Sequence, residues 1–341
     1  MSISEPLVYI VILNWKDPDI TLRCVQSLKR SKYKKYKVVL INNSPSEEIR
    51  KLIEEENIDI AYIGNKTNLG FTGGANQGIE YAMKHDANYI WLLNNDVEVP
   101  EDCLLNLITE MESDERIGLL SPVIVDPAKP LNPFYGKKVD SVNGQMLNAF
   151  DEQTYLEWLT SEPWKIELWG TALLINKNLV NAIGDLDNNF FAYYEDNDYS
   201  FRSNQAGFQN RTCLRANVFH KTDNNIYTEK KSYRFFLIAR NHYLFWIKRG
   251  ISKPTAIYWT LNVFIPKIVQ LHREDKDIVA QPYLGGLWQG IIKNTFGLLP
   301  ANLNAPKLVY KFTVYIAGIL LDLLSKFRCF KGRINIIFRK I

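Results

Sequence analysis

LVYIVIL, at residues 7–13, is a continuous apolar run that decides how the first hundred residues are interpreted. A strand buried on both faces of a parallel sheet has this pattern, whereas a half-exposed strand would alternate apolar and polar residues. Asp17-Pro18 follows and predicts a helix to about Ser31, because aspartate caps helices and proline suits their first turn. The chain therefore opens with a buried strand followed by a helix.

The same alternation continues toward residue 93. Further strands are predicted at residues 37–41, 58–63 and 89–93, and further helices from Ser46 and over residues 73–84. Strands that alternate with helices predict a mainly parallel sheet flanked by helices, and ligands of such sheets bind beyond the carboxyl ends of the strands.

Small polar residues and glycines recur at those predicted strand ends. They are Asn14 with Trp15, Asn42 with Asn43, the turn from Asn68 through Gly73-Gly74 to Asn76, and Asn94-Asn95-Asp96. A glycine-rich turn that opens a helix can present backbone N–H groups to an anion. Each loop alone is also typical of ordinary turns. GxGxxG after the first strand and GxxxxGK[ST] are both missing from the sequence, which disfavours a dinucleotide fold and a P-loop.

YYEDNDYSFR, at residues 193–202, places three carboxylates between aromatic residues. Apolar surroundings and neighbouring acids both raise the pKa of a carboxyl group, so Glu195 or Asp196 is a candidate base. Asp198 and Arg202 have the spacing of a helical ion pair. The structural alternative is a helix start with paired acids.

These segments together resemble a family-2 glycosyltransferase with the GT-A fold, over about residues 7–250. The resemblance is carried by VYIVILNW, VVLINNSPSE, NLGFTGGANQG, WLLNNDVEVPED, GTALLINKNLV and IGDLDNNFFAYYEDNDYSFRSNQAGF. The chain is most similar to the subgroup that contains bacterial rhamnosyltransferases of surface-polysaccharide assembly, including O-antigen and capsule.

The resemblance implies a role for each matching position. The donor-binding residues would be Leu13, Asn14, Trp15, Asn42, Asn43, Asn68, Gly73, Gly74, Asn94 and Asn95. Asp96 and His220 would bind Mg²⁺ or Mn²⁺, and Trp169, Gly170, Thr171 and Glu195 would bind the acceptor. Asp196 would be the catalytic base, with Glu195 as its partner. The family often has aspartate where this chain has Asn42, which bears on base and ribose selectivity.

The activity implied is metal-dependent, inverting transfer of a sugar from a nucleotide-diphosphate donor to a glycan or lipid-linked glycan. L-rhamnose from dTDP-rhamnose is the first expectation. The alternatives are a UDP-sugar transferase with galactosyl, glucosyl or N-acetylhexosaminyl specificity, and a non-catalytic scaffold. A nucleotidyltransferase would need a basic, glycine-rich loop after the first strand, and NWKDPD does not supply one.

The charge is distributed unevenly along the chain. Residues 307–341 hold eight Lys and Arg and one acid, whereas the whole chain has a net charge of +4. We therefore predict a glycosyltransferase domain at residues 1–250 and a helical region, broken by prolines, at residues 251–341. The basic helix of this region would bind an anionic membrane surface or form a homodimer contact, and nucleic acid is not expected. Four scattered cysteines and no signal-peptide pattern favour a cytoplasmic protein, peripheral at the inner face of the membrane.

Overall fold

The computed structural model describes residues 5–140, 144–221 and 232–293 of the chain. The chain forms two compact units, Met1–Asp223 and Asn224–Ile341. The predicted domain boundary at residue 250 stays a prediction, and the structural division precedes the first helix of the second unit.

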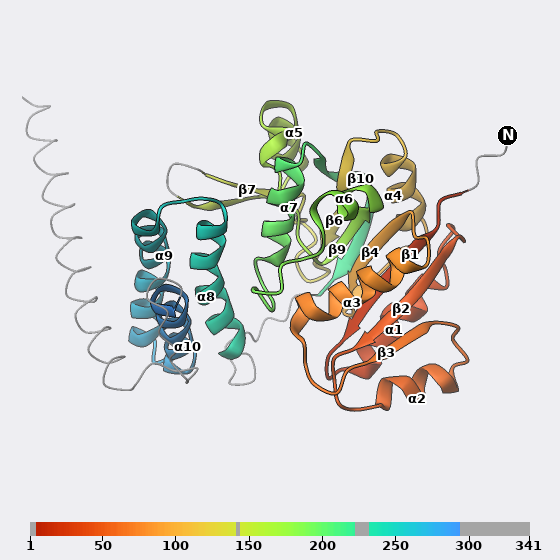
Figure 1. Ribbon diagram of the computed structural model, residues 1–341, viewed down its shortest axis with the longest axis horizontal. Coiled ribbons are helices and arrows are strands. Elements are labelled where there is room, and N and C mark those ends of the chain that lie inside the picture. Colours follow the sequence, from red (N-terminus) through yellow and green to blue (C-terminus); the bar gives the residue numbers. More distant parts are fainter. Residues whose placement is uncertain (1–4, 141–143, 222–231, 294–341) are drawn as a thin grey trace, which may run out of the picture. The chain divides into compact units, whose positions relative to one another are not determined.

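The first unit is built on an eight-stranded, mainly parallel sheet in the order β3-β2-β1-β4-β9-β6-β10-β5 (Figure 1). Its strands are β1 (Val8–Asn14), β2 (Tyr36–Asn42), β3 (Ala61–Gly64), β4 (Tyr89–Asn94), β5 (Val97–Glu98), β6 (Ile117–Val125), β9 (Ala172–Asn176) and β10 (Gln209–His220). Strand β9 runs antiparallel to both β4 and β6, and β5 runs antiparallel to β10. The mixed α/β fold expected from the alternating strands and helices is confirmed.

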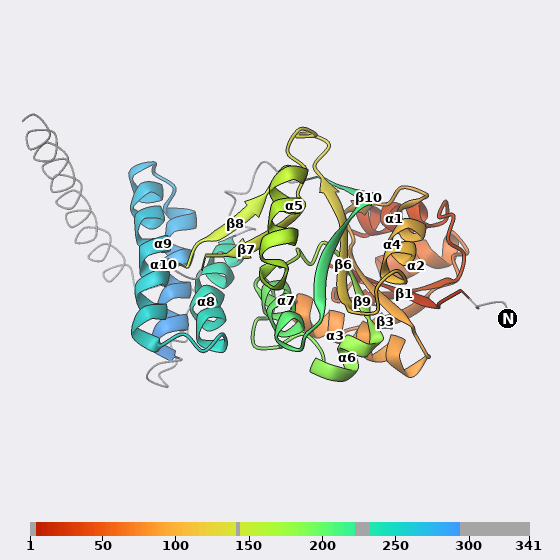
Figure 2. The same ribbon diagram turned by 90° about the horizontal axis from the view of Figure 1, so that it is seen from above.

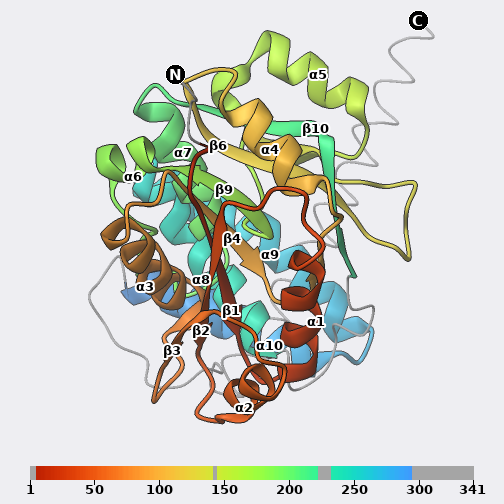
Figure 3. The same cartoon turned by 90° about the vertical axis from the view of Figure 1, so that its right-hand side faces the viewer.

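Helices cover both faces of this sheet, which is why β1 is apolar throughout. One face packs against α1 (Pro18–Leu28), α2 (Glu48–Glu55) and α4 (Cys103–Met111). The other face packs against α3 (Gly70–Lys84), α5 (Glu152–Ser161), α6 (Lys177–Ile183) and α7 (Glu195–Gln205). Figure 3 shows α1 and α3 on opposite sides of β1. All seven residues of β1 are buried.

A small second sheet belongs to the same unit. Strands β7 (Gly136–Val139) and β8 (Met146–Ala149) pair antiparallel (Figure 2). Lys137 of β7 also forms a two-bond bridge with Glu167, which precedes β9. This bridge ties the small sheet to the segment that leads into the main sheet.

Helix α3 begins at Gly70, three residues before its predicted start. Gly74 and Gly78 lie inside the helix and face the sheet. A Cβ on Gly78 would lie 2.2 Å from Cγ1 of Val11, and one on Gly74 would lie 2.7 Å from Cδ2 of Leu13. Both glycines let α3 pack close to β1. The predicted approach of a ligand at Gly74 is therefore not supported, because protein atoms occupy that space.

The second unit contains helices α8 (Ser232–Lys248), α9 (Lys253–Arg273) and α10 (Asp277–Trp288), which lie side by side in Figures 1 and 2. The expectation that prolines break these helices is wrong at two positions, because Pro266 lies inside α9 and Pro282 inside α10. Pro266 is exposed, so water can bind the carbonyl that its missing N–H leaves unpaired. None of the described helices is long and apolar enough to cross a membrane. The predicted basic helix at 307–341 lies outside the described residues.

Replacing Gly78 by alanine should destabilise the protein. The new methyl group would overlap both methyl groups of Val11, at 2.2 and 2.9 Å, and we expect a loss of ~1–3 kcal/mol in the free energy of unfolding. Urea denaturation measures this loss. The double variant Val11→Ala/Gly78→Ala should cost less than the sum of the single changes, because the first makes room for the second. Additive losses would show that these residues do not meet.

Candidate active site

The polar ends of three strands align at one edge of the sheet. Asn14 of β1 is in register with Asn42 of β2, and Leu13 is in register with Asn94 of β4. Strands that run parallel end at the same edge, so the residues that follow β1, β2 and β4 face a common region. The structure thus brings together Asn14, Asn42 and Asn94, as the sequence predicted.

A chain of hydrogen bonds connects these side chains. Asn95 Nδ2 donates to Thr21 Oγ1 at 2.8 Å, and Thr21 Oγ1 donates to Asn14 Oδ1 at 2.7 Å. Asn14 Nδ2 in turn donates to Asn42 Oδ1 at 2.8 Å. Asn14 and Asn42 are almost completely buried. Their side chains therefore hold the edge of the sheet together.

Asn42 uses its full hydrogen-bonding capacity inside the protein. Its Oδ1 accepts from Asn14 and from the backbone N–H of Ser44 at 3.1 Å. Its Nδ2 donates to the Ser46 carbonyl at 2.8 Å and to Tyr62 Oη at 2.9 Å. The Ser44 N–H can only donate and the Ser46 carbonyl can only accept, so the amide has one possible orientation. Aspartate could not make the two donated bonds.

The glycine-rich turn is also held by internal bonds. Asn43 Nδ2 donates to the Gly70 carbonyl at 2.7 Å, and Asn68 Oδ1 accepts from the Gly70 N–H at 2.8 Å. The Thr72 N–H donates to the Phe191 carbonyl at 3.1 Å. Two N–H groups of the first turn of α3 are thus bonded within the protein and do not await an anion. Two of the predicted donor-binding residues are exposed, Asn68 in this turn and Trp15 after β1.

The loop that precedes α7 packs on this turn in a strained conformation. Gly70 has φ +78°, and a Cβ there would lie 2.4 Å from the Phe191 carbonyl oxygen, so glycine is required on both counts. Phe191, Tyr193 and Tyr194 have φ of 64°, 68° and 74°, which side-chain-bearing residues rarely adopt. Such strain is found preferentially at functional sites and persists only where surrounding contacts fix the backbone.

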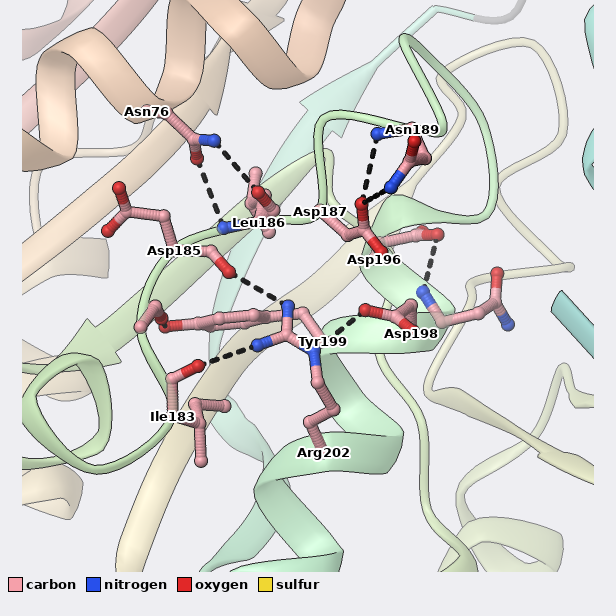
Figure 4. Close-up of polar contacts among 12 residues, drawn as sticks. Asn76, Ile183, Asp185, Leu186, Asp187, Asn189, Asp196, Asp198, Tyr199 and Arg202 are labelled. Atoms are coloured by element: carbon pink, nitrogen blue, oxygen red, sulfur yellow. Dashed lines mark hydrogen bonds and ion pairs between the residues drawn. The ribbon is translucent and has the colours of Figure 1, made fainter. Parts of the chain in front are cut away.

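Side chains of α3 and α7 hold the first part of the same loop, at residues 183–186 (Figure 4). Asn76 forms a reciprocal pair with the backbone of Leu186, at 2.8 and 3.1 Å. Arg202 donates to the carbonyls of Ile183 and Asp185 and, through Nε, to Asp198 Oδ2 at 2.8 Å. The predicted ion pair between Asp198 and Arg202 is confirmed. The loop is therefore held from α3 on one side and from α7 on the other.

Asp96 and His220 are brought into contact at the end of β4. His220 Nε2 lies 3.2 Å from Asp96 Oδ1, and the pairing of β10 with β5 sets this contact. Two ligands at adjacent corners of an octahedral cation, with bonds of about 2.1 Å, stand about 3 Å apart. The distance between the two atoms is therefore close to that between two neighbouring ligands of one divalent cation. Among the described residues no group of three or more His, Cys, Asp or Glu is placed to hold a metal, so further ligands would come from substrate or water.

The acid pair begins helix α7, where the helix dipole favours negative charge. Asp196 Oδ2 accepts from Lys137 Nζ at 3.1 Å and from the Gly170 N–H at 3.0 Å. Its Oδ1 accepts from the Asn197 N–H at 2.8 Å. A carboxylate offers about four acceptor positions, so these three bonds leave one on Oδ1.

Glu195 lies in a different environment, although it is the neighbouring residue. It is buried, and its Oε2 has no hydrogen-bond partner among the residues that the structure describes. Burial, with a smaller contribution from the charge of Asp196, raises the pKa of Glu195 to about 8. Glu195 is therefore protonated at neutral pH and can donate a hydrogen bond.

The predicted acceptor residues connect the acid pair with the end of β4. Trp169 stacks on Phe134 with ring centroids 3.5 Å apart, and the Thr171 carbonyl accepts from the Asn94 N–H at 2.9 Å. Between them, Gly170 donates to Asp196. Three consecutive residues thus link Asp196 to Asn94, which lies two residues before Asp96.

Sequence reasoning missed Lys137, Glu167, Thr21 and Tyr62. Lys137 stands in GKKV, which resembles an exposed hairpin strand, and Glu167 is a single acid between apolar residues. Neither has a local signal, because their partners are distant in the chain. Buried lysine and glutamate almost always have partners, so only their burial, which the sequence does not give, could have indicated the role.

Comparison with known proteins now adds to this geometry. Residues 8–164 match the family described as Glycosyl transferase family 2. This range includes the strand-end residues and Asp96, and it ends before α7 and His220. The assignments of Glu195, Asp196 and His220 therefore rest on the geometry and on the resemblance of their own segments.

Two relatives and one solved structure are similar over most of the chain. The low-salt glycan biosynthesis hexosyltransferase Agl10 of Haloferax volcanii is 24% identical over 75% of this chain and 83% of its own length. The galactofuranosyltransferase GlfT1 of Mycolicibacterium smegmatis is 21% identical over 65% of this chain and 77% of its own. The mannosyltransferase PcManGT of Pyrobaculum calidifontis, solved with GDP-Man and Mn²⁺, has a TM-score of 0.54 and 12% identity, and the match covers 87% of this chain and 89% of that one. The last likeness supports the fold alone.

The raised pKa of Glu195 predicts how stability depends on pH. The unfolded chain ionises this group above its ordinary pKa of about 4.5, whereas the folded protein keeps the proton until about pH 8. The group's contribution is complete below pH 4.5 and is lost as the pH rises to 8, by on the order of a few kcal/mol. Glu195→Gln should remove this loss. Urea denaturation of both proteins from pH 5 to 8 should show the variant gaining on the wild type, and parallel curves would contradict the assignment.

Proposed function

This chain belongs to the family 2 glycosyltransferases, and from that premise we propose that it transfers a hexosyl unit from a nucleotide-diphosphate sugar to a glycan hydroxyl, with inversion. The contact of Asp96 with His220 at the carboxyl edge of the sheet carries this proposal. It brings a carboxylate and an imidazole together from distant parts of the chain, beside the strand ends where α/β proteins bind their ligands.

Asp96 Oδ1 and His220 Nε2 would hold Mg²⁺ or Mn²⁺. The bound cation would neutralise charge on the leaving diphosphate. Asp96 is about half exposed, which leaves it accessible to a diphosphate, and His220 is more buried and therefore more fixed. Asn95, the residue before Asp96, is fixed by its hydrogen bond to Thr21. The protein would thus supply two of the six ligands of an octahedral cation from residues that are already in contact.

Asp196 is placed to act as the base. Its Oδ1 would accept the proton of the acceptor hydroxyl as that oxygen bonds to the anomeric carbon and the bond from this carbon to the diphosphate breaks. Such a single displacement inverts the anomeric centre. Glu195, protonated at neutral pH, has an unpaired Oε2 and would donate a hydrogen bond to the acceptor or to a hydroxyl of the transferred sugar. The two adjacent carboxyl groups would then have different tasks.

The sugar is a hexose in this proposal, because the relatives are named as a hexosyltransferase and a galactofuranosyltransferase. L-rhamnose from dTDP-rhamnose, the first expectation from sequence, remains one member of this class. A glycan or lipid-linked glycan of the cell surface is the proposed acceptor class. The competing candidate is a non-catalytic scaffold, favoured by the internal saturation of Asn42.

A donor panel tests the proposal and separates it from a scaffold. Wild-type protein should hydrolyse or transfer from one nucleotide-hexose of a panel that includes UDP-galactofuranose, UDP-glucose, GDP-mannose and dTDP-rhamnose, and only with Mn²⁺ or Mg²⁺. Asp96→Ala should weaken metal-dependent nucleotide binding about 100-fold, or ~2.7 kcal/mol, since it removes half of the protein's ligands. Calorimetric titration with and without Mn²⁺ measures this.

Glu98→Ala is the matched control, because Glu98 is an exposed acid two residues away that pairs with Arg30. It should bind nucleotide like the wild type. Equal, metal-independent binding by the wild type and Asp96→Ala would refute the metal site, and binding without turnover of any donor would favour the scaffold.

Asp196→Asn should lower the rate at saturating substrates by ~10²–10⁴, the usual contribution of a general base. Donor affinity should stay unchanged, because the strand-end residues and Asp96 are untouched. Asp198→Asn, two residues further along α7, is the control: it should lose ~1–3 kcal/mol of stability with its Arg202 pair and keep the rate. Melting temperatures recorded beside the rates guard against unfolding. Wild-type turnover by Asp196→Asn would place the base elsewhere.

A further inference from the structure

We propose that Lys137 is a positioning residue for the reaction, one that holds the Asp196 carboxyl group and aims its free oxygen at the acceptor. This inference rests on the proposed function, since it concerns the same base. It starts from an unusual feature: the Lys137 side chain, on a short hairpin strand, is only 5% exposed. Lysine is almost never buried without a charged partner.

The ammonium group makes two bonds, both to the first turn of α7. Lys137 Nζ donates to Asp196 Oδ2 at 3.1 Å and to Asn197 Oδ1 at 2.9 Å. It occupies the oxygen of Asp196 that also accepts from Gly170, and it leaves the other oxygen with an open acceptor position. The bonds to Oδ2 restrict rotation of the carboxylate and thereby fix the direction in which the open acceptor position of Oδ1 points.

Lys137 is itself held in a closed ring of bonds. Asn197 Nδ2 donates to Glu167 Oε2 at 2.8 Å. The backbones of Lys137 and Glu167 exchange two further hydrogen bonds, at 3.0 and 2.8 Å. Three segments, β7, α7 and the approach to β9, are thus joined through Lys137 and Asn197. Such a ring fixes the position of Nζ to an extent that a flexible surface lysine would not reach.

The charges around Asp196 explain what the lysine does. The charge of Asp196 acts on Glu195, its neighbour on the same helix, and Lys137 reaches Asp196 from β7, whereas Asp198 is paired with Arg202. Without Lys137, Glu195 and Asp196 would share this partly buried region with no cation among their contacts in the described residues. Both members of the acid pair would then hold protons more strongly. A base that is protonated at working pH cannot accept the acceptor's proton.

Lys137→Met tests this role, because it keeps the length of the side chain and removes the charge. We expect the rate at saturating substrates to fall about 10- to 100-fold at neutral pH, as part of the general-base contribution is lost. The acidic limb of the pH–rate profile should move up by about 1–3 pH units, the usual effect of losing an opposite charge. Lys137→Arg keeps the charge and should leave the limb near its wild-type position, even where the rate is lower.

Lys138→Met is the matched control. Lys138 is the next residue of the same strand, points the other way and pairs with Glu162 at 2.7 Å. This variant removes the same charge from the same strand and should leave the pH–rate profile unchanged. A lysine needed only for folding would lower the melting temperature or the amount of active protein without moving the limb.

A second readout does not depend on catalysis. Carboxyl ¹³C NMR titration should show the Asp196 and Glu195 resonances titrating at higher pH in Lys137→Met than in the wild type. If no donor is turned over by the wild type, the proposed function fails, and the titration still decides whether Lys137 controls the pair. An unchanged pH–rate limb in an active Lys137→Met, or unchanged carboxyl titrations in a folded one, would overturn the inference.

Discussion

The register between β1 and its two parallel neighbours is the constraint on which the rest of the site depends. It sets Asn14 opposite Asn42 and Leu13 opposite Asn94, so that three chain segments leave the sheet at one level. A slip of one residue would turn every side chain of a strand to the other face. Here both faces are buried under helices, so such a slip would misplace apolar residues on both sides at once. The apolar core thereby fixes the polar edge.

Beyond that edge, the site is organised around a balance of charge. Asp196 is held by one ammonium group and two backbone N–H groups, whereas its neighbour Glu195 is buried and neutral at physiological pH. Adjacent residues on a helix point in different directions, and this alone places them in different surroundings. The strained residues from Phe191 to Tyr194 lead into the start of α7, and the bond from the Thr72 N–H to the Phe191 carbonyl fixes them to α3.

Local patterns predicted what is local in this protein. The strands β1, β2 and β4, the strand-end asparagines and the ion pair of Asp198 with Arg202 all follow from neighbours a few residues apart. Lys137 and Glu167 could not be predicted, because their partners on α7 come from distant segments. The role of Gly74 was misjudged for a related reason: glycine allows a close approach, and only the fold reveals that Leu13 makes it. His220 reached Asp96 through strand pairing, which the resemblance anticipated and spacing alone could not.

The saturated amide of Asn42 has a consequence for how sequences related to this one can diverge. Each of its two donated bonds ends on an oxygen, at Ser46 and at Tyr62. A carboxylate in its place would put a negatively charged oxygen next to the Ser46 carbonyl oxygen, and these two acceptors would repel each other. Tyr62 would have to redirect its hydroxyl hydrogen toward the carboxylate. The exchange of this amide for an acid is therefore not a neutral single step. It demands accompanying changes in the 44–46 turn or at position 62. The order in which such substitutions accumulate is therefore restricted, because an acid at position 42 is tolerated only after the groups that now accept from Asn42 Nδ2 have changed.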